Sequence, residues 1–156
     1  MAKIHRYERA FLILSAIMLV VFLAALGYAA FGMGLHLPTR AGQIRPEDVP
    51  RTPPFDRPGV REVEPGRWEA VIVARAWGFN PAEIRVPVGQ PVTFRITSVD
   101  IIHGFHVDDT RINLMVLPGQ VSELEYTFRE AGEHLVICHE YCGAGHHAMA
   151  GKVIAE

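Results

Sequence analysis

The stretch VTFRIT, residues 92–97, alternates apolar and polar side chains. The same period of two recurs in ELEYTF, residues 123–128, where Leu124, Tyr126 and Phe128 are the apolar members. Successive side chains of a β-strand point to opposite faces, so this pattern predicts strands with one buried face and one solvent-exposed face. The two stretches therefore indicate a β fold.

Short apolar runs separated by turn residues continue this pattern along the C-terminal part of the chain. Further strands are expected at residues 68–75, 82–86, 103–107, 111–116, 134–138 and 150–155. Turns are expected at Asn80-Pro81, Val88-Gly89, Pro118-Gly119 and Ala131-Gly132. Many short strands without a helical stretch predict an all-β sandwich or barrel over residues 68–156. Such a small domain buries a modest core, so a bound metal would matter to its stability.

An uncharged segment, residues 11–33, lies near the N-terminus. As a helix it would be about 34 Å long, enough to cross a hydrocarbon core of about 30 Å. A signal peptide would have a shorter apolar region of about 7–15 residues and a small-residue cleavage site. We therefore expect a retained transmembrane helix over 11–33. The basic residues 1–10 place the N-terminus in the cytoplasm and the rest of the chain on the extracytoplasmic side.

Seven of the 11 prolines fall within residues 34–67. Proline fixes φ and lacks the backbone donor, so this segment is predicted to be an extended, unpaired linker. From Glu62 onward the chain has seven Lys and Arg against thirteen Asp and Glu. This acidic balance disfavours nucleic acid and favours a basic partner protein. Candidates for an acidic docking face are Asp108, Asp109, Glu123 and Glu125.

The segment CHEYCGAGHHAM, residues 138–149, gathers ligands for soft metal ions. It holds both cysteines of the chain, followed by a histidine and a methionine, in the pattern C-x3-C-x3-H-x2-M. Thiolates, imidazole and thioether suit copper or zinc. The best additional donor is His103, in DIIHGFH, residues 100–106. Ligands from two distant segments require a prefolded scaffold, unlike those of a small zinc finger.

Several kinds of site are compatible with these residues. A disulfide between Cys138 and Cys142 is permitted outside the cytoplasm, but it leaves the histidines without a shared role. Structural zinc would use both cysteines and two histidines but not Met149. A single blue copper would use one cysteine, two histidines and a weak axial methionine, leaving one cysteine over. Two copper ions bridged by both sulfurs make better use of the whole set.

The segments 100–106 and 138–149, together with LPGQ at residues 117–120, resemble subunit II of the haem–copper respiratory oxidases. The likeness is greatest to the short, single-helix subunits of B-type cytochrome c oxidases, and it covers essentially the whole chain. It implies a cupredoxin-like Greek-key β-sandwich with the dinuclear copper centre CuA. Both sulfurs would bridge the coppers, two histidines would each supply a nitrogen, the methionine would be a weak ligand and a glutamate would bind through its carbonyl. These residues are His103, Cys138, Glu140, Cys142, His146 and Met149.

The resemblance also implies a function. The subunit would receive electrons from cytochrome c or a small copper protein. It would pass them to the haem-copper catalytic subunit I, which reduces dioxygen to water. Trp77 lies where the family has an aromatic residue that accepts electrons, although core packing is an equal alternative. The Glu140 side chain would be free to help bind Mg²⁺ at the border between the subunits.

Four further histidines are not expected to bind copper and are assigned surface or supporting roles, namely His106, His134, His139 and His147. The main alternative function is a membrane-anchored copper chaperone of the Sco kind, which also uses C-x3-C and a distant histidine. In those proteins the cysteines precede the histidine on a thioredoxin-like fold, whereas His103 comes first here. A membrane-tethered cupredoxin without an oxidase is a second alternative.

Overall fold

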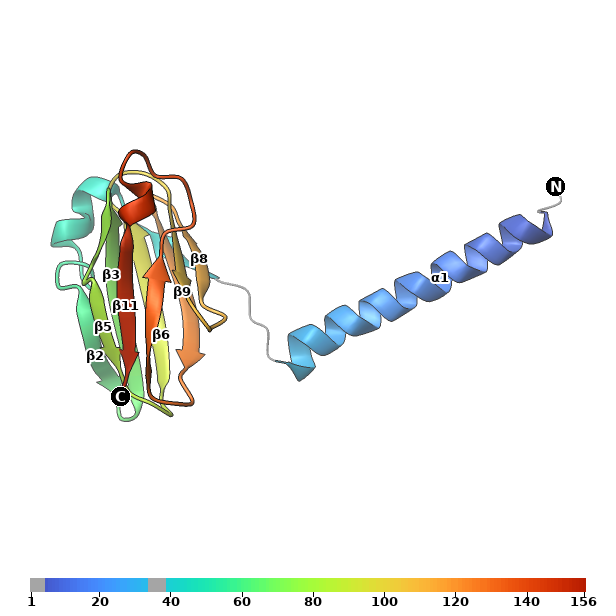
Figure 1. Ribbon diagram of the computed structural model, residues 1–156, viewed down its shortest axis with the longest axis horizontal. Helices are drawn as coiled ribbons and strands as arrows, with labels where there is room; N and C mark the ends of the chain where they lie inside the picture. Colours follow the sequence, from blue (N-terminus) through green and yellow to red (C-terminus); the bar gives the residue numbers. More distant parts are fainter. Residues whose placement is uncertain (1–4, 34–38) are drawn as a thin grey trace. The chain divides into compact units, whose positions relative to one another are not determined.

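The computed structural model describes residues 5–33 and 39–156, which belong to two compact units divided after residue 37 (Figure 1). In the first unit, α1 (Arg6–Gly27) continues into a π-helical turn, η1 (Tyr28–Gly32). Its described side chains are all at least partly exposed, and the helix is long and apolar enough to span a membrane. An apolar helix is therefore present where one was predicted over 11–33, from Arg6 to Gly32, and its crossing of a membrane stays a prediction. The basic residue Lys3 lies outside the described residues.

The second unit contains two β-sheets (Figure 1). One has the strand order β1-β9-β6-β3-β2, with β4 paired to β3, and the other has the order β5-β11-β10-β7-β8. The strands are β1 (Thr39–Gln43), β2 (Gly59–Glu64), β3 (Arg67–Arg75), β4 (Gly78–Asn80), β5 (Glu83–Val86), β6 (Pro91–Ser98), β7 (His103–Val107), β8 (Asn113–Val116), β9 (Gln120–Thr127), β10 (Gly132–Ile137) and β11 (Ala150–Ala155). Every strand predicted from the sequence is present, with small differences at the ends.

The core between the sheets follows from the alternation in the sequence. The apolar residues of β6, Val92, Phe94 and Ile96, are fully buried. From the facing sheet, Phe105 is also fully buried. Its ring packs edge to face against that of Phe79, with the ring centroids 5.3 Å apart. Burying one such side chain stabilises the fold by about 1.5–3 kcal/mol. The predicted β-sandwich is confirmed.

The prediction of an unpaired linker over residues 34–67 is wrong for most of its length. β1 pairs with β9, and β2 pairs with β3. Between β1 and β2, the chain forms a short 3₁₀ helix, η2 (Pro46–Arg51). Residues 34–38 lie outside the described part. The folded domain therefore begins well before residue 68.

Residues 44–58, here called the strap, cover the outer face of the six-stranded sheet. In the strap, Val49 and Phe55 are 1% and 4% exposed. They pack against Val71, Val73 and Val121, whose side chains point away from the main core. This packing explains why the segment is not the unpaired linker that its prolines predicted. The apolar side chains of the strap cover a sheet face that water would otherwise reach.

Replacing Phe55 with alanine should therefore destabilise the domain. Large-to-small changes of a buried phenylalanine cost about 3–5 kcal/mol. The full-length chain in detergent would be unfolded with urea and followed by tryptophan fluorescence. The control is Val63→Ala on β2, where the side chain is 53% exposed and a change under about 0.5 kcal/mol is expected. Equal, small losses in both variants would mean that the strap is only loosely attached.

Candidate metal centre

The strand pairing brings the proposed ligands to one end of the sandwich. Residues 138–149 connect β10 to β11, and the two strands meet at that end with Ile137 opposite Ala150. β7 pairs with the other edge of β10 and begins at His103. The backbone N–H of Cys138 donates to the carbonyl of Met149 at 3.2 Å and closes the loop. Two segments far apart in sequence therefore meet.

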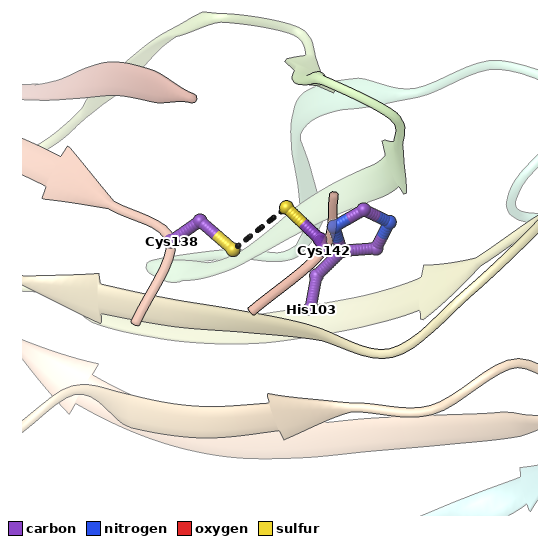
Figure 2. A group of neighbouring side chains, drawn as sticks. All are labelled: His103, Cys138 and Cys142. Carbon is purple, nitrogen blue, oxygen red and sulfur yellow. Dashed lines mark hydrogen bonds between the residues drawn. The ribbon is translucent and has the colours of Figure 1, made fainter. Parts of the chain in front are cut away.

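The six proposed ligands converge at this end. The Sγ atoms of Cys138 and Cys142 are 3.7 Å apart and face one another (Figure 2). Cys142 Sγ also lies 3.5 Å from His146 Nδ1 and 3.6 Å from Met149 Sδ. The carbonyl oxygen of Glu140 is 3.2 Å from Cys138 Sγ. One ligand atom of His103 lies within 4.8 Å of both sulfurs.

These distances distinguish among the sites that the sequence left open. Both cysteines are free thiols, and 3.7 Å is far longer than the roughly 2.05 Å of a disulfide. His103 is fully buried, and its Nδ1 has no hydrogen-bond partner among the described residues. A buried polar atom without a partner is costly, and a metal ion bound at Nδ1 would satisfy it. The residues therefore fit a metal held by thiolates and imidazoles.

Asp100 orients His103 and was missed in the sequence analysis. Its Oδ1 lies 2.9 Å from His103 Nε2, which favours the tautomer whose Nδ1 lone pair is free for a metal. Burial raises the pKa of Asp100, but hydrogen bonds from the backbone N–H of Ala76, from His103 and from the Ile101 N–H lower it below its usual range. The carboxylate is therefore charged at neutral pH. The sequence did contain a signal for this role, namely an aspartate three residues before the proposed ligand His103.

The Cys142 thiol is held in its neutral form in the metal-free chain. Burial, followed by the hydrogen bond with Cys138, raises the pKa of Cys142 to about 11. Since a metal binds the thiolate, metal binding at Cys142 must release a proton near neutral pH. The affinity of the site for metal is therefore expected to rise with pH.

Trp77 packs against the loop formed by residues 138–149. Its Nε1 donates to the carbonyl oxygen of Cys142 at 2.7 Å. The ring lies so close to Gly145 that a Cβ there would approach it to 2.4 Å. Trp77 is 49% exposed and lies outside both apolar clusters. Ordinary core packing therefore does not explain its position.

The other residues singled out in the sequence are not among the proposed ligands. Glu123 and Glu125 form ion pairs with Arg95 and Arg67 across the six-stranded sheet. Asp108 and Asp109 follow β7, at the opposite end of that strand from the metal-binding loop. In the described residues, the ligand atoms that all lie within 4.8 Å of one another are those of His103, Cys138 and Cys142, and His146 joins them through its Nδ1, 3.5 Å from Cys142 Sγ. This group does not include the four histidines that were not expected to bind copper. These are His106, His134, His139 and His147.

A family profile, a related sequence and a solved structure all show similarity to the same group of proteins. The profile of the family "Cytochrome C oxidase subunit II, periplasmic domain" matches residues 80–155. A cytochrome c oxidase subunit 2 of Thermus thermophilus is 39% identical over 154 residues, covering 96% of this chain and 92% of the relative. A chain in the cryo-EM structure of a heme-copper terminal oxidase dimer is 38% identical with a TM-score of 0.81, over 97% of this chain and 100% of that one.

A more distant likeness concerns the fold alone. The crystal structure of the periplasmic domain of subunit II of cytochrome oxidase of Bradyrhizobium japonicum is 18% identical, with a TM-score of 0.53. The match covers 56% of this chain and 83% of that one. The predicted cupredoxin-like sandwich is thereby confirmed.

The raised pKa of Cys142 predicts how the stability of the metal-free chain depends on pH. Between pH 9, where the thiol of the unfolded chain ionises, and about pH 11, the folded state holds more protons than the unfolded state. Stability should therefore fall as pH rises through this range, by on the order of 2 kcal/mol for this group. Urea unfolding of the metal-free chain would measure the slope. A Cys142→Ala variant should have a shallower slope, and equal slopes would contradict the assignment.

Proposed function

The chain belongs to the family of cytochrome c oxidase subunit II, and we propose that its metal centre is the dinuclear copper centre CuA. As a member of this family it is an electron-transfer subunit of a terminal oxidase, and so part of an enzyme. The reduction of dioxygen to water is assigned to the haem-copper catalytic subunit. The alternative of a Sco-like chaperone is wrong, because the domain is a β-sandwich and not a thioredoxin-like fold.

One observation carries the proposal of two coppers: two buried free thiols lie 3.7 Å apart, with the Glu140 carbonyl oxygen 3.2 Å from one sulfur and His146 Nδ1 3.5 Å from the other. Zinc would leave the buried Met149 unused, and a single blue copper would leave one cysteine unused. Copper bound here would supply a one-electron carrier shared through both sulfurs. The protein contributes fixed positions: Asp100 orients His103, the strand ladders hold the loop, and burial keeps water away.

The proposed partners follow from the architecture. Similarity along the whole chain to a subunit of a heme-copper oxidase supports a catalytic subunit as a partner. The electron donor is proposed to be cytochrome c or a small copper protein. With α1 as the membrane anchor, residues 1–10 would lie on the cytoplasmic side and the β domain on the periplasmic side.

The copper content of the chain tests the proposed centre. Full-length protein reconstituted in detergent with excess copper should bind two copper ions per chain. Cys142→Ser should bind fewer, since one bridging sulfur is lost, whereas the control His147→Ala, changed at an exposed histidine of the same loop, should still bind two. One metal ion per wild-type chain, or a preference for zinc, would contradict a dinuclear copper centre.

Trp77 is proposed as the residue at which electrons arrive. Its half-exposed ring links the surface to the carbonyl of the proposed ligand Cys142. In the assembled oxidase, Trp77→Ala should reduce turnover with cytochrome c by roughly tenfold, equivalent to about 1.4 kcal/mol of barrier. The visible spectrum of the centre should persist. The control Trp68→Phe, on a strand away from the loop, should keep full turnover, and full turnover in Trp77→Ala would remove this role.

Glu140 is proposed to contribute to a Mg²⁺ site at the border with the catalytic subunit. Its carbonyl faces Cys138 while its side chain is 39% exposed, with Oε1 3.8 Å from His139 Nδ1. A carboxylate is a suitable ligand for Mg²⁺. Oxidase carrying Glu140→Gln should lose Mg²⁺ on purification, while the control Glu133→Gln, on β10, should retain it. An unchanged Mg²⁺ content in Glu140→Gln would dismiss the proposal.

A further inference from the structure

The register of β7 and β10 places His139 opposite Gly104. In the paired part, Val136 lies opposite Val107 and Ile137 lies opposite His106. Two residues further along this antiparallel register, His139 comes opposite Gly104. Side chains alternate between faces, so both positions lie on the outer face of the sheet, as His106 and Ile137 do. The residues after the proposed ligands Cys138 and His103 are thus cross-strand neighbours.

The His139 ring occupies the space in which a side chain of residue 104 would lie. A Cβ added at Gly104 would be 2.6 Å from the ring atoms Cγ and Nδ1 of His139 and 2.7 Å from Cδ2. Atoms essentially never approach so closely, so the contact requires glycine. Glycine inside a strand often marks such a close approach by another group.

The same glycine also makes a hydrogen bond to a proposed copper ligand. The backbone N–H of Gly104 donates to Cys138 Sγ at 3.4 Å, and both groups are buried. The other contacts of His139 are loose: Nδ1 is 3.8 Å from Glu140 Oε1, and its ring centroid is 6.4 Å from that of His106. Packing against Gly104 is therefore the main constraint on the ring.

We propose that His139 and Gly104 form a positioning pair that holds the Gly104 N–H against the Cys138 sulfur. The proposal rests on the copper centre proposed above. A hydrogen bond to a thiolate stabilises its negative charge, which is greater when the site is reduced. The pair therefore raises the reduction potential of the site.

Three variants of the copper-loaded, full-length chain test this role by redox titration. Gly104→Ala displaces the ring and weakens the hydrogen bond, and His139→Ala removes the packing that holds the Gly104 backbone in place, so the hydrogen bond to Cys138 Sγ weakens there too. Each should lower the equilibrium constant for one-electron reduction about tenfold, a shift of about 59 mV. His139→Phe keeps a ring of similar size and should retain the wild-type potential. A shift in His139→Phe as large as in His139→Ala would overturn the steric account.

The double variant Gly104→Ala/His139→Ala separates a clash from a general loss of structure. The new methyl group then has the space of the missing ring, so the metal-free double variant should unfold at a higher temperature than metal-free Gly104→Ala. Equal unfolding temperatures would show that the ring is not what makes glycine necessary. The matched control is Gly132→Ala on β10, where the nearest atom, His134 Nε2, is an ordinary 3.7 Å away. Its potential should be that of wild type.

The outcomes also separate this inference from the proposed function. A wild-type chain that binds no pair of copper ions would refute the centre itself. A normal centre in the wild type, with unchanged potentials in Gly104→Ala and His139→Ala, would refute only the positioning pair.

Discussion

The pairing of β10 with β7 on one side and β11 on the other is the constraint on which the metal centre depends. It fixes both ends of the 138–149 loop and places His103 beside that loop. Within the loop, a short 3₁₀ helix, η3 (His146–Ala148), carries the proposed ligand His146. A rigid sheet edge suits electron transfer, because ligands that barely move when the charge changes keep the reorganisation energy small.

The protonation states of two residues next to these strands also bear on metal binding. Asp100 is ionised and accepts hydrogen bonds that fix its position, and it in turn orients His103. Cys142, buried and neutral without metal, has a pKa of about 11. A metal ion must therefore displace the proton of Cys142 when it binds, so metal binding is coupled to proton release. Of the four acidic residues considered for docking, Glu123 and Glu125 form ion pairs and Asp108 and Asp109 follow β7, and their role in docking stays a prediction.

Much of the fold could be predicted, because one-sided strands leave a period-two pattern and turns leave Gly and Pro. The sequence analysis did not predict that the strap packs on the sheet, because its prolines indicated an extended, unpaired segment. The evidence for it was the unbroken apolar run AVIVA, residues 70–74, which indicates a strand covered on both faces. Residue type and spacing singled out the cysteines, histidines and methionine of the proposed set, whereas Glu140 and the complete set came from the resemblance to the oxidase family. The roles of Asp100 and Gly104 could not be predicted, because they depend on the register and on side-chain packing across strands.

The electron paramagnetic resonance spectrum of the oxidised, copper-loaded full-length chain tests the central claim most directly. Full-length protein is needed because a fragment beginning at Glu62 would lack the strap and part of β2. If the two cysteines bridge a pair of copper ions, the spectrum will show one unpaired electron coupled equally to two copper nuclei. Coupling to a single copper nucleus would contradict the account, as would a chain that holds one metal ion and gives no signal.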